Sequence, residues 1–335
     1  MDSINILVTS ALSAVALSRI AAVSPKIKIM DVSGLWDAPD MVTAMRKGDF
    51  SNEKFEAMLA QAEIIYGFRP PQNIIVRGPK LRWIQTMLAG VDHFLTPDIV
   101  KSRVVVTNMS GIHASPVSEV AFSMMLMFAK RAPFCFLNKQ QKKWERFIPM
   151  LLHGKTVGIV GLGNIGRELA RLSKAFGLRI IGTRRTARKG DKARYVDLVV
   201  PMTELKALLA ESDFVVLLLP NTPETQKLIG EKELSAMKPT GYLINVGRGS
   251  TVDEEMMVRA LEEGWIAGAG LDAYTVEPLP VESKLWELPN VIVSPHVSGR
   301  LANYDDVVTE LFCDNLKRYL SGKRLRNIVN KKMGY

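Results

Sequence analysis

The chain has 335 residues, of which 47% are hydrophobic and 23% charged, and its formal net charge is +10. This length predicts two domains, and the composition is that of a soluble globular protein. No apolar run reaches the roughly 18 residues of a membrane span, and no basic segment precedes the short apolar stretch at residues 12–23. We therefore predict neither a membrane protein nor a signal peptide.

The basic residues are spread along the chain, with local concentrations at residues 139–146 and 323–332. No nucleic-acid-binding motif accompanies them, so we expect a field that attracts an anionic substrate and cofactor, and no nucleic-acid partner. Cys135 and Cys313 lie in apolar, helix-like segments, which predicts buried free thiols in a reducing cytoplasm. No spacing of Cys or His residues predicts a metal site.

The first hundred residues alternate strand-like and helix-like stretches. Strand patterns occupy residues 4–8, 26–32, 63–68, 80–87 and 103–107, and helix patterns occupy residues 12–23 and 55–62. This alternation predicts a parallel sheet covered by helices. No glycine-rich turn occurs in this part of the chain, so we do not predict that it binds a nucleotide.

Residues 115–130 have the pattern of a helix rich in Met and Phe. Ser115 can cap its N-terminus, and Pro116 suits the first turn. The composition is typical of a buried helix, which we expect to lie between the domains.

Residues 155–185 read as strand, turn, helix and strand, and the turn has the sequence Gly161-Leu162-Gly163-Asn164-Ile165-Gly166. Gly161 allows a tight turn, Gly163 lets a pyrophosphate approach the backbone, and Gly166 lets helix and strand pack closely. The N-terminus of the helix favours phosphate. Glycines alone would also fit an ordinary turn between buried elements. The strand before them and the helix after them predict a dinucleotide site.

The end of the second strand, Thr183-Arg184-Arg185, indicates which dinucleotide binds. Sites for NAD usually carry Asp or Glu here, which binds the ribose 2′-hydroxyl. This chain has a hydroxyl and two guanidinium groups, which suit a 2′-phosphate. We therefore predict NADP(H), with NAD(H) left open. The alternative interpretation is a solvated basic turn.

Four further strand patterns follow, at residues 213–219, 241–246, 266–271 and 291–294. Ligands of parallel sheets bind beyond the carboxyl ends of the strands. Pro220, Arg248, Asp272 and His296 all follow such ends. A helix pattern at residues 303–320 is predicted to return to the first domain, which would make that domain discontinuous.

Carbonyl reduction by hydride transfer needs a group that holds the carbonyl and a poised proton donor. Arg248 can polarise the carbonyl and bind an adjacent carboxylate. His296 can donate the proton, because imidazole changes charge near neutrality. Glu277 can accept the other imidazole N–H and stabilise the imidazolium. Taken singly, each side chain has an ordinary interpretation, as a turn arginine, a satisfied core histidine and an exposed loop acid.

The chain resembles the D-isomer-specific 2-hydroxyacid dehydrogenase family over nearly its whole length, most strongly at residues 154–299. The segments that carry the resemblance are GKTVGIVGLGNIG, LLLPNTPET, NVGRGSTVDEEMMVRALEEGWIAGAGLDAY, VEPLP, NVIVSPHVSG and LAGVDHF. The resemblance implies two Rossmann-like doubly wound parallel-sheet domains with a cleft between them. It implies a substrate-binding domain at residues 1–104 and 297–335, and a dinucleotide-binding domain at residues 105–296.

The resemblance also implies roles for single residues. Arg248 stands at the substrate-binding arginine, Glu277 at the glutamate that pairs with the histidine, and His296 at the catalytic acid/base. Backbone N–H groups are implied to hold the substrate carboxylate at Ala89, Gly90 and Val91. The expected cofactor contacts are Gly161, Gly163, Asn164, Ile165, Gly166, Thr183, Arg184, Arg185, Pro220, Thr225, Val246, Gly247, Asp272, His296 and Gly299. Of these, Asp272 is implied to lie near the nicotinamide carboxamide.

We expect NADP(H)-dependent interconversion of a small 2-oxo acid, such as glyoxylate or hydroxypyruvate, and a D-2-hydroxy acid, by a cytoplasmic homodimer. Formate dehydrogenases share the architecture but pair their histidine with an amide, so Glu277 favours a reaction with proton transfer. Oxidation of phosphite or formate stays open. A non-catalytic dinucleotide sensor or corepressor is the other alternative, because relatives of this architecture serve in that way. The intact set of Arg248, Glu277 and His296 weighs against it.

Overall fold

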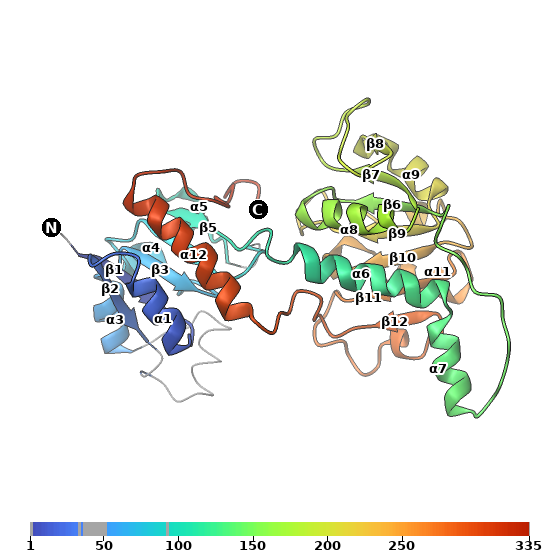
Figure 1. Cartoon of the computed structure of the whole chain (residues 1–335), viewed down its shortest axis with the longest axis horizontal. Coiled ribbons are helices and arrows are strands. Elements are labelled where there is room, and N and C mark those ends of the chain that lie inside the picture. Colours follow the sequence, from blue (N-terminus) through green and yellow to red (C-terminus); the bar gives the residue numbers. More distant parts are fainter. Residues whose placement is uncertain (1–2, 33–34, 36–51, 92–93, 335) are drawn as a thin grey trace. The chain divides into compact units, whose positions relative to one another are not determined.

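A computed structural model describes residues 3–32, 35, 52–91 and 94–334. It divides into two compact units (Figure 1): Met1–Ile112 with Leu301–Tyr335, here named the terminal unit, and His113–Arg300, the central unit. The chain passes between them after Ile112 and after Arg300, whereas the boundaries expected from the sequence fell after residues 104 and 296.

The terminal unit is built on a five-stranded parallel sheet with the strand order β2-β1-β3-β4-β5. Its elements are β1 (Ile4–Val8), α1 (Ala14–Ala21), β2 (Ile27–Asp31), α3 (Glu53–Leu59), β3 (Ile64–Gly67), α4 (Ile74–Arg77), β4 (Trp83–Thr86), α5 (Pro97–Lys101), β5 (Val105–Thr107) and α12 (Tyr304–Leu320). Every residue of β3 and β4 is buried, as expected for strands covered on both faces. The helix α12 packs beside α1 (Figure 1), and its Phe312 stacks on Tyr66 with ring centroids 4.0 Å apart.

The central unit is built on a seven-stranded parallel sheet with the order β12-β11-β10-β9-β6-β7-β8. Its strands are β6 (Thr156–Val160), β7 (Arg179–Thr183), β8 (Leu198–Val200), β9 (Phe214–Leu217), β10 (Tyr242–Asn245), β11 (Gly268–Leu271) and β12 (Val291–Val293). Its helices are α6 (Ala114–Ala129), α7 (Ala132–Gln140), α8 (Asn164–Ala175), η1 (Met202–Glu204), α9 (Leu205–Glu211), α10 (Glu231–Leu234), η2 (Gly249–Thr251), α11 (Glu254–Glu262) and η3 (Lys284–Trp286). The strand order reverses between β6 and β9, the place where such sheets bind ligands beyond their carboxyl ends.

Two helices, α6 and α8, lie side by side on one face of the central sheet (Figure 1). Met124 and Phe128 of α6 are buried in the core that this face forms with β6, β9 and β10, so the prediction of a buried Met- and Phe-rich helix is confirmed. The predicted fold class, two Rossmann-like α/β units on parallel sheets, is also confirmed.

Two local predictions are wrong. The helix α6 begins at Ala114, because its hydrogen bonding already starts from the carbonyl of His113, and Ser115 lies inside the first turn and does not cap it. Cys135 is exposed, because α7 buries none of its residues. Among the described residues, no single helix has the length and hydropathy of a membrane span; α6 and α7 reach them only together, as a pair bent by 64°.

Candidate active site

The glycine-rich turn between β6 and α8 depends on its glycines. Gly161 has a φ of 119°, and a Cβ there would lie 2.7 Å from the carbonyl oxygen of Leu218. The N–H groups of Gly161 and Leu162 donate to the carbonyl of Thr183 at 3.0 and 2.9 Å, which ties the turn to the end of β7. A Cβ on Gly166 would collide with the carbonyl oxygen of Gly161. A side chain at Gly161 or Gly166 would therefore prevent this turn from forming.

The N-terminus of α8 faces open space. Gly163 is the N-cap residue of this helix, and a Cβ there would meet no atom within 4 Å. Asn164 and Ile165 begin the helix, and the N–H groups of a first turn have no partners within the helix itself. These donors and the helix dipole suit the pyrophosphate of a dinucleotide.

The residues after β7 have mixed surroundings. The side chain of Thr183 is fully buried, and its Oγ1 has no hydrogen-bond partner among the described residues. Arg185 is exposed. Arg184 donates from Nη2 to Oδ2 of Asp191 at 2.9 Å. The acid that the strand end lacks therefore lies in the following loop, where it orients one guanidinium group.

The loops after β9 and β10 approach each other closely. In the first, the Thr225 hydroxyl donates to the carbonyl of Pro220 at 2.7 Å and accepts from the N–H of Thr222 at 2.8 Å, which closes the loop. In the second, a Cβ on Gly247 would lie 3.0 Å from the carbonyl oxygen of Leu219. Glycine at this position is what allows the two loops to be neighbours.

Arg248 follows β10 in a segment that Asn245 holds. The amide of Asn245 donates to the carbonyl of Arg248 at 3.0 Å and accepts from the N–H of Gly247 at 3.1 Å. The hydroxyl of Thr251 donates to the same Arg248 carbonyl at 2.7 Å, and Val246 is buried. Arg248 itself donates from Nη1 to the carbonyl of Gly247 at 3.0 Å. The backbone at Arg248 is thus fixed from two sides.

His296 and Glu277 form a hydrogen-bonded pair. The Nδ1 atom of His296 lies 2.8 Å from Oε2 and 2.9 Å from Oε1 of Glu277. The N–H of Tyr274 donates to Oε1 at 3.1 Å, which orients the carboxylate. An ionised carboxylate only accepts, so Nδ1 carries a proton, and Nε2 is the ring atom that can serve a substrate. The two side chains are 46% and 38% exposed, so both are open to solvent in the central unit.

The segment after His296 is held at Gly299. The carbonyl of Gly299 accepts from Nδ1 of His113 at 3.0 Å, and a Cβ on Gly299 would lie 3.3 Å from that nitrogen. Burial lowers the pKa of His113, although the bond to the Gly299 carbonyl acts in the opposite direction. The neutral ring is therefore the favoured form. Asp272 is 1% exposed and lies against the same segment.

The expected substrate loop belongs to the terminal unit, after β4. The Nδ2 of Asn108 donates to the carbonyl of Ala89 at 2.7 Å, which fixes the start of the loop that continues through Gly90 and Val91. Asp92 and His93, of the same motif, lie outside the described residues.

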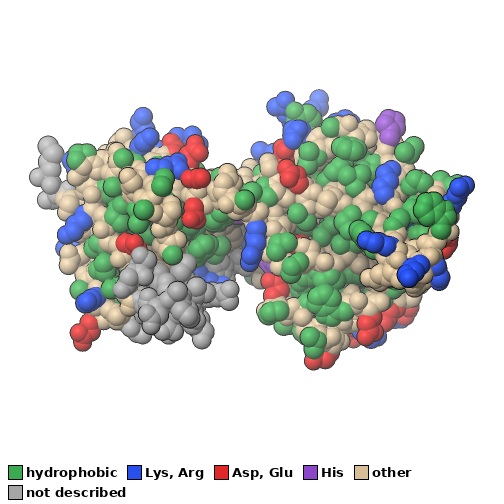
Figure 2. Space-filling model, turned by 60° about the horizontal axis from the view of Figure 1, so that its bottom comes forward, with side chains coloured by type: hydrophobic (Ala, Val, Ile, Leu, Met, Phe, Trp, Pro, Cys, Tyr) green, Lys and Arg blue, Asp and Glu red, His purple; other side chains and the backbone are tan. Residues whose placement is uncertain are grey.

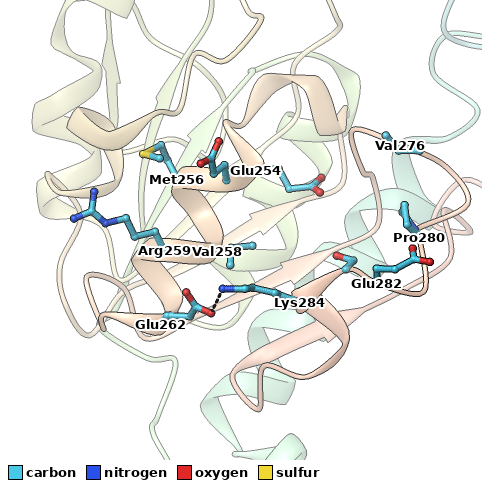
Figure 3. Close-up of a pocket in the computed structure, with 11 residues that line it drawn as sticks. Glu254, Met256, Val258, Arg259, Glu262, Val276, Pro280, Glu282 and Lys284 are labelled. Atoms are coloured by element: carbon cyan, nitrogen blue, oxygen red, sulfur yellow. Dashed lines mark hydrogen bonds and ion pairs between the residues drawn. The ribbon is translucent and has the colours of Figure 1, made fainter.

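One open pocket of the central unit lies between α11 and the segment 276–284 (Figure 3). Its volume is 690 Å³, and it contains none of the expected site residues. It is lined by Glu254, Glu255, Met256, Val258, Arg259, Glu262, Val276, Pro280, Glu282, Ser283 and Lys284. The glutamates outnumber the two cations, and one cation, Lys284, is paired with Glu262 at 2.9 Å. The pocket is therefore unsuited to an anionic substrate or cofactor.

Basic side chains are dispersed on the face that Figure 2 shows, where Lys and Arg of the described residues stand among hydrophobic and acidic ones. Among the described residues, no group of three or more His, Cys, Asp or Glu side chains is arranged to hold a metal ion.

Sequence reasoning missed several residues that hold this site. Asp191, Tyr274 and Ser294 each contact an expected site residue through hydrogen bonds that only the folded chain reveals. Asp191 is the one with a signal in the sequence, as the first acid after the basic strand end.

The phosphate-suited turn and the His–Glu pair at the carboxyl ends of one parallel sheet define a dinucleotide-dependent oxidoreductase. A family model described as "D-isomer specific 2-hydroxyacid dehydrogenase, NAD binding domain" matches residues 122–298. The chain belongs to this family.

Relatives and solved structures agree with this assignment. A glyoxylate reductase of Thermococcus litoralis is 37% identical over 273 residues, which cover 78% of this chain and 80% of that protein. A D-isomer specific 2-hydroxyacid dehydrogenase of Xanthobacter autotrophicus Py2, solved with NADPH and MES, superimposes with a TM-score of 0.82 at 27% identity over all of both chains. An NADPH-dependent glyoxylate/hydroxypyruvate reductase of Sinorhizobium meliloti, solved with NADP and sulfate, superimposes with a TM-score of 0.80 at 25% identity, over 99% of this chain and 100% of that chain.

Proposed function

We propose that the chain is an NADPH-dependent reductase that converts a small 2-oxo acid into the D-2-hydroxy acid, reversibly. The observation that carries the proposal is the pairing of His296 Nδ1 with the Glu277 carboxylate at 2.8 and 2.9 Å. It leaves Nε2 to face a substrate, in the unit that also carries the glycine-rich turn.

In this mechanism His296 gives the proton of Nε2 to the carbonyl oxygen of the substrate. The reduced nicotinamide, when bound, supplies the hydride that the carbonyl carbon accepts. Glu277 orients the imidazole for the transfer, because its carboxylate accepts the hydrogen bond of Nδ1. In the reverse direction the neutral imidazole takes the proton from the hydroxy acid.

Arg248 is proposed to bind the substrate carboxylate and polarise the carbonyl, since a guanidinium group donates in a planar fork that matches a carboxylate. The backbone N–H groups of Ala89, Gly90 and Val91 are proposed to hold the same carboxylate. The fixed backbone at Arg248 supports this role, because it sets the point from which the side chain reaches a substrate.

The cofactor is proposed to place its pyrophosphate at Gly161, Gly163, Asn164, Ile165 and Gly166. Its remaining contacts are proposed at Thr183, Arg184, Arg185, Pro220, Thr225, Val246, Gly247, Asp272, His296 and Gly299. NADP(H) is preferred over NAD(H) in this proposal, because Arg184 and Arg185 follow β7 where an acid would repel a 2′-phosphate. Two similar structures hold NADP or NADPH, which supports the same choice.

Glyoxylate and hydroxypyruvate are the proposed substrates, because the relatives named above act on them by name. The test is NADPH and NADH oxidation with glyoxylate, hydroxypyruvate, pyruvate and bulkier 2-oxo acids. We expect turnover with the small acids and a higher kcat/KM with NADPH. Dinucleotide binding without turnover on any acid would instead point to a sensor, and NADP reduction by phosphite or formate would point to those anions.

The chain is also proposed to form a homodimer through its central units. Between residues 136 and 151, five large apolar side chains are 42–94% exposed: Phe136, Leu137, Trp144, Ile148 and Leu151. Large apolar side chains exposed along one stretch of chain commonly mark an interface, and a second copy would cover these. Light scattering should give twice the chain mass for the wild type and a shift toward the monomer for a Trp144→Ser, Ile148→Ser variant. A monomeric wild type would contradict the proposal.

A further inference from the structure

The segment from Ser294 to Gly299 carries His296 after the last strand, β12, and lies outside helix and strand. His296 has a φ of 52°, a left-handed conformation that residues with a Cβ adopt rarely. Its own N–H donates to the nearby carbonyl of Ser294 at 3.0 Å. A backbone of this kind persists where the surrounding structure determines it. Contacts from outside the segment therefore have to hold it.

Asp272, which follows β11, makes these contacts. Its Oδ1 accepts from the hydroxyl of Ser294 at 2.6 Å and from the N–H of Val297 at 2.9 Å, and its Oδ2 accepts from the N–H of Ser298 at 2.9 Å. One donor precedes His296 in the chain and two follow it. A single carboxylate thus holds the backbone on both sides of the imidazole.

The carboxylate of Asp272 is only 1% exposed, and among the described residues its interactions are these three hydrogen bonds, with no ion pair to a Lys, Arg or His. A buried carboxylate is costly unless donors surround it. Its own N–H donates to the carbonyl of Asn245 at 2.9 Å, which anchors it to the end of β10. The sheet therefore fixes the carboxylate, and the carboxylate fixes the segment.

We propose that Asp272 is a positioning residue for His296, an inference that rests on the proposed function. Glu277 orients the imidazole ring through Nδ1, whereas Asp272 sets the backbone from which the ring projects. Tyr274 contacts both Glu277 and the segment of His296, since its N–H donates to Glu277 at 3.1 Å and its hydroxyl accepts from the N–H of Ser294 at 3.0 Å. The short segment from Asp272 to Glu277 thus supplies both the acid that orients the imidazole ring and the acid that holds the backbone of its segment.

The substitution Asp272→Asn tests this role, because the amide keeps the size of the carboxylate but turns one acceptor into a donor that faces another donor. We expect kcat with glyoxylate and NADPH to fall about tenfold to a hundredfold, as for a displaced catalytic group. The kcat is taken at saturating NADPH, so that a change in cofactor affinity at Asp272 does not enter it. Ser294→Ala removes one of the three donors without touching Asp272, and should lower the same kcat less.

The matched control is Asp253→Asn, the same substitution in the same unit. Asp253 caps α11 by accepting from the N–H of Met256, a role that Asn fills as well. It should leave kcat unchanged. A weaker NADPH affinity in Asp272→Asn with kcat preserved at saturating NADPH would place the role of Asp272 on the cofactor and overturn the proposal.

A second measurement needs no turnover. The imidazole ¹H–¹⁵N signals of His296 are those missing from a His296→Gln variant, and we expect them to shift or broaden in Asp272→Asn while those of exposed His153 stay. Unchanged His296 signals would contradict the positioning role. If the wild type has no activity on any 2-oxo acid but Asp272→Asn still changes the His296 signals, the proposed function would be refuted and the positioning of the ring by Asp272 would be supported. Thermal unfolding of each variant shows that it is folded.

Discussion

The Nδ1 atom of His296 lies 2.8 Å from Oε2 and 2.9 Å from Oε1 of Glu277, nineteen residues earlier in the chain. Both side chains are partly open to solvent. Because an ionised carboxylate only accepts hydrogen bonds, the pair places a ring proton on Nδ1 and leaves Nε2 as the atom that can serve a substrate.

Glu277→Gln keeps the hydrogen bond to Nδ1 and removes the charge. We expect kcat for reduction to fall about a hundredfold or more, because the amide no longer places a negative charge beside the imidazole that gives the proton. Initial rates with glyoxylate at saturating NADPH measure this fall. Glu282→Gln, an exposed acid of the neighbouring loop, should behave as the wild type. A kcat in Glu277→Gln close to that of the wild type would separate Glu277 from the chemistry.

Arg184 carries the prediction of cofactor preference. Arg184→Ala should lower kcat/KM with NADPH by about tenfold or more and leave the value with NADH nearly unchanged, because a charge-assisted bond to the 2′-phosphate is lost. Arg171→Ala is a suitable control, since this arginine lies on α8 and is paired with Glu168. Equal losses with both cofactors would mean that Arg184 does not discriminate between them.

Asp191 tests how Arg184 is oriented. Asp191→Asn removes the counter-charge that lies 2.9 Å from the guanidinium group. Because the guanidinium group loses the carboxylate that orients it, the preference for NADPH should fall in this variant and not in Arg171→Ala, and an unchanged or higher preference would contradict this role of Asp191. The ratio of kcat/KM with NADPH and NADH measures this effect.

His113 predicts a pH dependence of stability. Burial lowers the pKa of His113 in the folded chain below its usual value of 6.5. As the pH falls through 6.5, the unfolded chain takes up this proton first, so the contribution of His113 is full above that pH and is lost below it. In His113→Asn, Nδ2 can still donate to the Gly299 carbonyl, but nothing titrates. The stability difference between wild type and variant should therefore shrink or reverse on acidification.

Urea unfolding at about pH 7.5 and about pH 5 measures that difference on the two sides of the transition. His153→Asn, at an exposed histidine of the same unit, provides the control and should show no such change. A His113→Asn variant that loses stability in parallel with the wild type on acidification would contradict the assignment of a buried neutral His113.

The sequence predicted the elements whose pattern is local. Strands such as β6 and β9 are continuous apolar runs, and the turn at Gly161 follows from residue type alone, because only glycine fits its φ of 119°. The predicted start of α6 was wrong. Ser115 is a good N-cap by residue type, but His113 occupies the N-cap position and the helix begins at Ala114. The capping preference of a residue type does not determine where a helix begins when the preceding residues already have helical hydrogen bonding.

The candidate site residues are proposed from residue type and motif, whereas the residues that support them could not be predicted. The sequence places Glu277 and His296 after strands, yet the hydrogen bonds of Asp272 to Val297 and Ser298 depend on the parallel pairing of β11 with β12. The partner of Arg184, Asp191, likewise follows from the path of a loop. The spacing of these residues in the sequence does not predict that they are in contact.

The most direct test of the account is NADPH oxidation with hydroxypyruvate by the wild type and by His296→Ala, together with the NADPH Kd of each. We predict that the wild type turns over and that kcat in the variant, at saturating NADPH, falls by at least about a hundredfold while the variant still binds NADPH, because the proton donor is lost and the other contacts proposed for the nucleotide remain. A variant that retains most of the wild-type kcat would contradict the assignment of His296 as the acid.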